Sequence, residues 1–156
     1  MQSKPIEILI CGQIQKSAPE ICAALLETER WSEFTGYFIL PGVKSADFEV
    51  KTPEIVGSRI KVQNTDGSTH LEEIIEWEPN RQVAMKFQNF EGPVKNLATH
   101  FVETWSFEPA KEGVTATRKM AFFPKNWLGW LVLIPISQLM KKAFEKELKR
   151  QGGQPD

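Results

Sequence analysis

Closely spaced turns between segments of alternating apolar and polar residues constrain the fold of this chain more than any other feature of its sequence. Asp66-Gly67 joins two such segments, and both residue types tolerate the positive φ angles of a two-residue hairpin turn. Side chains two residues apart share one face of a strand, so this turn predicts that Ile60 lies opposite Glu73. The sequence therefore predicts antiparallel strands with one largely apolar face.

Further reversals extend this pairing. Glu78-Pro79-Asn80-Arg81 indicates an odd-length loop or a bulge, and later turns follow Gly92-Pro93 and span 109–113. The predicted pairs are Ile75 with Val83, Glu73 with Met85, Phe87 with Phe101, Met85 with Glu103, Trp105 with Ala116, Phe107 with Val114 and Glu103 with Arg118. Three charged side chains thus fall on a face that is otherwise apolar. They either form a buried ion network or line a cavity that receives the polar end of a ligand.

The remaining segments complete an α+β architecture within a single domain of residues 4–150. The expected elements are a strand at 6–15, a helix at 18–27 capped by Ser17, a helical turn at 29–34, a covering loop at 35–44, a strand at 46–52, and a helix at 127–150 kinked by Pro135. We expect a curved antiparallel sheet of seven strands wrapped around the long C-terminal helix, with two short helices after the first strand. The tail, residues 151–156, is expected to be disordered.

Composition and charge exclude several functions. A net charge of −1 does not suit a nucleic-acid backbone, and Cys11 and Cys22 have neither metal-ligand spacing nor the density of a disulfide scaffold. His70 and His100 are expected on outward faces, so we expect no metal and no cofactor. The chain opens without a signal-peptide pattern, and 127–140 is too short and too interrupted for a membrane span. These features indicate a cytoplasmic protein.

Several short motifs also occur in an informative order and spacing. They are Pro19-Glu20-Ile21, Leu25-Leu26, Glu29-Arg30-Trp31-Ser32-Glu33-Phe34, Leu40-Pro41-Gly42-Val43, Val56-Gly57-Ser58, Glu76-Trp77-Glu78-Pro79 and Thr104-Trp105-Ser106-Phe107-Glu108. Over residues 4–150 the chain resembles the SRPBCC superfamily, which has the START-like helix-grip fold, and is most similar to its polyketide cyclase/dehydrase-like branch. The resemblance implies a deep hydrophobic cavity between sheet and helix, which relatives use for lipids, hormones or polyketides. It implies no single reaction.

The candidate ligand-binding residues lie on the predicted inner face, in or near the covering loop, or on the long helix. They are Trp31, Phe34, Tyr37, Glu73, Ile75, Met85, Phe87, Phe101, Glu103, Trp105, Arg118, Met120, Phe122, Trp127, Leu131 and Ile134. Glu73 and Glu103 are also the catalytic candidates, because apolar surroundings raise the pKa of a carboxyl group and Arg118 could hold one partner ionised. The same three residues could instead satisfy one another as a structural network.

Three hypotheses for function follow. The leading one is binding of a small hydrophobic molecule, the second is a cyclase or dehydratase that uses a buried glutamate as base, and the third is a protein-partner module of the chaperone-activator type with a filled core. The spacing of Trp127, Trp130, Leu131 and Ile134 indicates packing on the sheet. The alternative for this helix is peripheral membrane contact, in which its apolar first half acts together with its basic end.

Overall fold

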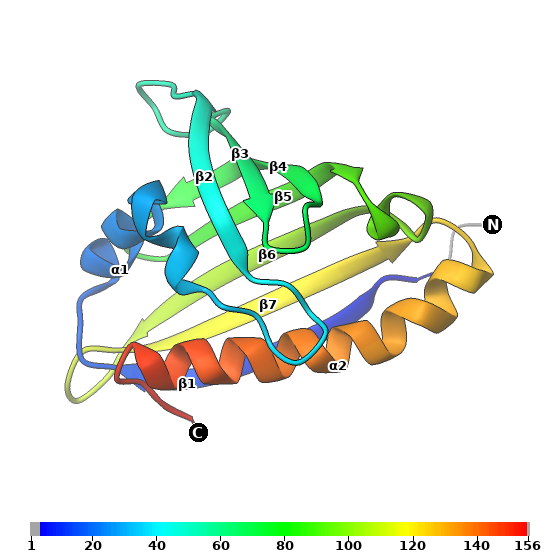
Figure 1. Ribbon diagram of the computed structural model, residues 1–156. Coiled ribbons are helices and arrows are strands. Elements are labelled where there is room, and N and C mark those ends of the chain that lie inside the picture. Colours follow the sequence, from blue (N-terminus) through cyan, green and yellow to red (C-terminus); the bar gives the residue numbers. More distant parts are fainter. Residues whose placement is uncertain (1–3, 156) are drawn as a thin grey trace.

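A single curved antiparallel sheet grips a long C-terminal helix in the computed structural model, which describes residues 4–155 (Figure 1). The elements in chain order are β1 (Ile6–Ile14), α1 (Ala18–Leu25), η1 (Thr28–Glu33), β2 (Val43–Val50), β3 (Arg59–Asn64), β4 (Thr69–Glu78), β5 (Gln82–Glu91), η2 (Pro93–Asn96), β6 (Ala98–Pro109), β7 (Val114–Pro124), α2 (Trp127–Arg150) and β8 (Gln154–Pro155). The strand order across the sheet is β2-β3-β4-β5-β6-β7-β1-β8.

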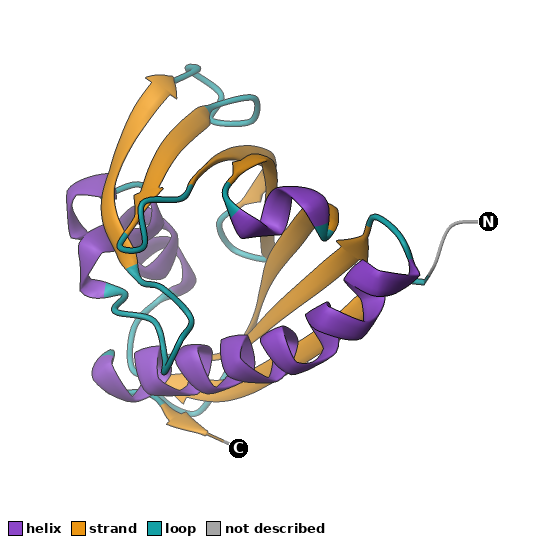
Figure 2. Ribbon diagram, turned by 45° about the vertical axis from the view of Figure 1, so that its right-hand side comes forward, coloured by secondary structure: helices purple, strands orange, loops and turns teal. Residues whose placement is uncertain are grey.

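The layers follow the expected helix-grip arrangement. Helix α2 runs along β1 and β7, while α1 and η1 lie at one end of the curl next to β2 (Figures 1 and 2). The predicted fold class is therefore confirmed: seven curved strands, a long C-terminal helix and two short helices after the first strand. The short β8 is an addition, since Gln154 and Pro155 pair with Gln13 and Gly12, where the sequence predicted a disordered tail.

Side-chain caps set the start of both α-helices. The Ser17 Oγ accepts a hydrogen bond from the Glu20 N–H at 3.2 Å, and Asn126 Oδ1 accepts one from the Gly129 N–H at 2.9 Å. Gly129 is also required for close packing, because a Cβ atom there would lie 2.1 Å from the carbonyl oxygen of Leu97. Helix α2 is thereby held against the segment before β6, and it extends over the predicted residues 127–150.

The predicted register between β3 and β4 is wrong by one residue. The turn is a three-residue loop in which Gly67 has a φ of +88° and donates from its N–H to the Asn64 carbonyl at 3.0 Å. Ile60 consequently lies opposite Glu72 instead of Glu73. Because side chains alternate between faces, this slip turns Glu72 into the curl and Glu73 outward.

A bulge at Ile75 restores the inward face farther along β4. Ile74 pairs with Met85, but the next pair is Glu76 with Ala84, so Ile75 has no direct partner. The odd-length loop predicted after β4 is present as residues 79–81, yet the predicted pairs of Ile75 with Val83 and Glu73 with Met85 are wrong. The bulge allows both Ile74 and Trp77 to pack inside.

The remaining registers keep the predicted faces. Phe87 with Phe101 and Met85 with Glu103 are confirmed. Between β6 and β7 the pairing is shifted by two residues, so Trp105 lies opposite Arg118 and Glu103 lies opposite Met120. A shift of two residues leaves every side chain on its predicted face, and Arg118 therefore still points into the curl.

Candidate functional site

A cavity of about 610 Å³ lies between the concave face of the sheet, the C-terminal half of α2 and the loop between η1 and β2. Of the candidate residues, those that line it are Trp31, Phe34, Met85, Phe87, Phe101, Glu103, Trp105, Arg118 and Met120. Helix α2 contributes Ile136, Leu139 and Met140, and the β3–β4 hairpin adds His70 and Glu72. Most of this lining is apolar, and charged side chains come from the sheet, from η1 (Arg30 and Glu33) and from the end of α2 (Glu147 and Arg150).

Four other candidates lie away from this cavity. Glu73 and Ile75 project from the outer face of β4 because of the register slip, and Ile75 is exposed. Tyr37 lies in an exposed loop, and Phe122 is fully buried in the core among other aromatic side chains. The structure thus corrects the predicted position of Glu73 as a cavity carboxylate.

Helix α2 is rotated relative to the prediction. Its buried residues follow a spacing of four from Gly129 through Leu133 to Ser137, so a row with two small side chains packs closely on the sheet. Trp127, Leu131 and Ile134 are consequently exposed on the opposite side. The prediction that these three residues pack on the sheet or line the cavity is wrong.

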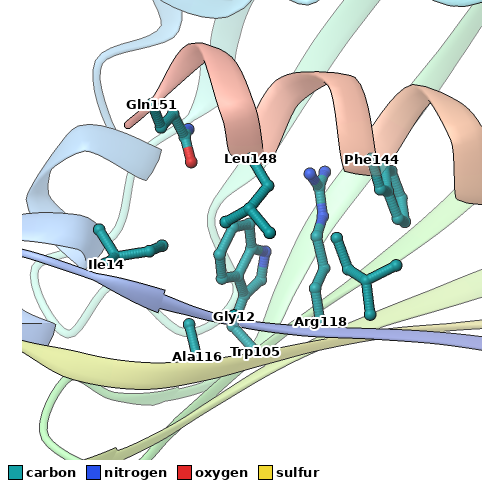
Figure 3. Close-up of a pocket in the computed structure, with 9 residues that line it drawn as sticks. Gly12, Ile14, Trp105, Ala116, Arg118, Phe144, Leu148 and Gln151 are labelled. Carbon is teal, nitrogen blue, oxygen red and sulfur yellow. The ribbon is translucent and has the colours of Figure 1, made fainter. Parts of the chain in front are cut away.

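Arg118 and Glu103 form a buried ion pair in the cavity wall. The Arg118 Nη2 and Nε donate to Glu103 Oε2 at 2.8 and 3.0 Å, and Trp105 Nε1 donates to Glu103 Oε1 at 3.1 Å. The guanidinium lies 3.6 Å from the centre of the Phe144 ring, and Figure 3 shows it extending from β7 toward α2. The Glu103 carboxylate therefore accepts three hydrogen bonds and has little remaining capacity for a ligand.

A second polar group in the wall consists of His70 and Glu72. The two side chains are almost fully buried, and His70 Nε2 lies 3.0 Å from Glu72 Oε2. The amide nitrogen of Asn64 lies 3.2 Å from His70 Nδ1 and donates to it, which leaves the proton of a neutral imidazole on Nε2, facing Glu72. Stacking on Phe87 at 5.2 Å further fixes the ring. The expectation that His70 points outward is wrong, while His100 stacks on Phe123 on the outer side.

Burial changes the proton affinity of Glu72. Desolvation raises the pKa of its carboxyl group and the nearby Glu103 charge acts in the same direction, while the hydrogen bond from His70 and the charge of Arg118 oppose the rise. Glu72 Oε1 accepts no hydrogen bond from any residue in the described part of the chain. This oxygen is therefore the carboxylate atom available to a molecule in the cavity.

Other chemistry has little support among residues 4–155. They contain no cluster of three or more histidine, cysteine or acidic side chains that could hold a metal ion. None of the helices described has the length and apolar character needed to cross a bilayer. Burial raises the pKa of Cys22 to about 11, so its thiol is a weak nucleophile at neutral pH.

Comparison with solved structures supports the same architecture. A START superfamily protein from Mycobacterium smegmatis aligns with a TM-score of 0.62 and 12% identity, over 95% of this chain and 99% of that one. Ginseng major latex-like protein 151 from Panax ginseng aligns with a TM-score of 0.61 and 14% identity, over 90% and 97%. The di-domain ARO/CYC StfQ of the steffimycin biosynthetic pathway gives 0.60 and 17%, over 94% of this chain and 45% of that one.

These low identities establish a shared fold and no more. No curated protein matches the sequence significantly. The family model for polyketide cyclase / dehydrase and lipid transport, however, matches residues 14–151, which include the whole cavity wall. The chain therefore belongs to the polyketide cyclase / dehydrase and lipid transport family.

Proposed function

We propose that this protein binds a small, mainly apolar molecule that carries one polar end. The observation that supports this most directly is a cavity of about 610 Å³ whose lining is mostly apolar and includes two buried polar groups on the sheet. Such a volume falls within the usual range for small-molecule sites. Trp31 and Phe34 line it beside the η1–β2 loop, where they would cover a bound molecule.

The polar groups restrict the chemistry of the ligand. Arg118 Nη1 donates no hydrogen bond within the described residues, so it remains available as a donor, and Glu72 Oε1 remains available as an acceptor or, when protonated, as a donor. A hydroxyl or carbonyl group could meet both requirements. We further propose that binding takes place in the cytoplasm, since two cysteines in 156 residues do not have the density of a secreted disulfide scaffold.

Filling the cavity should weaken binding. We expect Met140→Trp to raise the dissociation constant for the uncharged dye N-phenyl-1-naphthylamine at least about tenfold, because the larger side chain takes space from the ligand. The measurement is a fluorescence titration of protein that has been stripped of copurified molecules by unfolding and refolding. Met140 is only partly buried, so the fold should tolerate the change.

Gln138→Trp is the matched control for this titration. It introduces the same residue on the same helix but at an exposed position outside the cavity, and it should leave the dissociation constant unchanged. A stripped wild-type protein that fails to bind the dye would refute the proposal. Equal weakening by both tryptophan variants would show that the dye binds elsewhere.

A second candidate function is an aldol-type cyclase or dehydratase with Glu72 as the base. The specific observation is that Glu72, and not Glu73 or Glu103 as the sequence suggested, has a buried carboxyl group with a raised pKa and one oxygen that accepts no hydrogen bond from a described residue. A general base contributes roughly a hundredfold or more to rate. Glu72→Gln should therefore suppress loss of water from a linear poly-β-ketone, measured by mass spectrometry, while Glu73→Gln should not.

The chaperone-activator hypothesis has less support. It requires a filled core, and the space between sheet and helix is instead an open cavity. Its other requirement, an exposed apolar surface, is met by the first half of α2.

A further inference from the structure

The first half of α2 exposes large apolar side chains along one side. The exposed fractions are 71% for Trp127, 54% for Leu128, 40% for Trp130, 49% for Leu131 and 37% for Ile134. We call this surface the outer α2 face. Residues three and four apart lie next to one another on a helix, so these side chains form one continuous apolar area. No described residue covers it, although solvent contact with so much apolar surface is unfavourable.

The second half of the same helix is basic. From Lys125 to Arg150 the chain has six basic and two acidic residues, whereas the rest has 13 basic and 18 acidic ones. Lys141 and Lys149 have no ion-pair partner among the described residues. The charge is therefore strongly asymmetric, with a positive helix attached to an acidic body, and an anionic surface would attract the helix while repelling the remainder.

A neighbouring loop adds to this surface. Phe38 and Ile39 are 86% and 75% exposed at the tip of the η1–β2 loop. Lys146 Nζ donates to Thr35 Oγ1 at 2.8 Å and to the Gly36 carbonyl at 3.3 Å, which attaches this loop to α2. The loop reaches the C-terminal half of the helix in both views (Figures 1 and 2). Two exposed apolar elements thus border the same helix.

We propose that the outer α2 face docks on the surface of an anionic lipid bilayer. Tryptophan is favoured at the boundary between water and lipid, and lysines next to an apolar helix face add attraction to anionic headgroups. The described helices are unsuited to spanning, so α2 lies in the plane of the interface. Ile136, Leu139 and Met140 on this helix line the cavity, and docking brings that wall close to the bilayer.

A second copy of the chain fits this face less well than a membrane. Parallel pairing of two α2 helices would place basic halves against each other, and antiparallel pairing over the full helix would place the apolar half of one against the basic half of the other. Neither arrangement covers the apolar area without burying lysines. A bilayer accepts both halves at once.

Vesicle binding tests the proposal. The full chain should sediment with phosphatidylcholine vesicles that contain phosphatidylglycerol, bind far less to phosphatidylcholine alone, and show tryptophan quenching by brominated lipid. Trp127→Ser/Leu131→Ser should weaken binding at least about tenfold, because two apolar side chains that would be buried in the bilayer are lost. The control Leu9→Ser changes an equally exposed leucine, at 52%, on β1 and should have no effect.

Charge reversal provides an independent arm. Lys141→Glu/Lys149→Glu should weaken vesicle binding at least about tenfold, since each basic residue near an anionic bilayer contributes measurably to affinity. Lys61→Glu/Lys111→Glu changes the net charge equally at exposed positions outside α2 and should have a smaller effect. Both α2 variants should retain binding of N-phenyl-1-naphthylamine, which separates this proposal from ligand binding in the cavity.

Three outcomes would overturn the proposal. The first is the absence of binding to anionic vesicles, and the second is an equal loss of binding in the α2 variants and their controls. The third is a dimer in sedimentation equilibrium that Trp127→Ser/Leu131→Ser dissociates, because the outer α2 face would then belong to an interface between copies.

Discussion

Arg118→Met should lower the free energy of unfolding by about 3 to 5 kcal/mol, the usual cost of leaving one member of a buried ion pair without its partner. Glu103 is 4% exposed and receives two of its three hydrogen bonds from Arg118. Methionine retains an aliphatic stem but provides no donor, and the contact of the guanidinium with the Phe144 ring is also lost. Urea unfolding at neutral pH, followed by circular dichroism, measures the change.

The double variant Glu103→Leu/Arg118→Met should recover most of the lost stability. It removes both charges from the wall, and apolar replacements of a buried pair are often neutral or stabilising. Arg81→Met is the surface control, because Arg81 pairs with Glu76 and Glu78 in solvent and should contribute little. A wild-type midpoint for Arg118→Met would contradict a structural role and would leave ligand contact as the main role of this guanidinium.

Local chemistry made much of this fold predictable. Ser17 and Asn126 are residues that accept hydrogen bonds from the first turn of a helix, and both helices begin directly after them. Gly92-Pro93 indicates the position of the turn between β5 and β6, so the sequence predicts the pair of Phe87 with Phe101 correctly. These features depend on a few adjacent residues, and the sequence displays them fully.

The residues of β4 do not decide its register, because each face of the strand carries a glutamate followed two residues later by an isoleucine. A two-residue turn at Asp66-Gly67 favours one face, whereas a three-residue loop with Gly67 in the left-handed region favours the other. Asn64 is the missed signal: its side chain bonds Ser68 and His70 across the loop. Because of the one-residue slip, Glu72 is the cavity carboxylate in place of the predicted Glu73. For the same reason the sequence does not predict that His70 lies in the cavity wall.

The rotation of α2 was unpredictable for a different reason. Its first half is apolar on nearly all sides, so hydrophobic periodicity does not identify the face that packs on the sheet. The decisive residues are the small ones, because Gly129 and Ser137 allow the closest approach and larger side chains are left outside. The large apolar residues of this helix half therefore predict packing in the core, although they lie on the surface.

Glu72→Gln should stabilise the protein increasingly as the pH rises. Burial raises the folded-state pKa of Glu72 above its unfolded value of about 4.3, so folding favours the protonated carboxyl group. The stability that protonated Glu72 contributes is complete below the unfolded pKa and is lost as the pH rises through the folded pKa. Glutamine does not titrate, and it can still accept the hydrogen bond from His70. The free energy of unfolding of the variant should therefore rise relative to that of wild type between the unfolded and the folded pKa of Glu72. Above the folded pKa the difference should stay constant.

The expected gain at alkaline pH is on the order of 1 to 3 kcal/mol, the cost of a buried polar group that is incompletely paired. Glu73→Gln is the matched control on the outer face of the same strand, and its difference from wild type should not vary with pH in this way. Urea unfolding over a series of pH values measures both variants. His70, Glu103 and Arg118 face the same carboxyl group. A pH-independent difference for Glu72→Gln would mean that these groups and cavity water solvate the ionised carboxylate as well as bulk solvent does, which would remove the physical basis for Glu72 as a base.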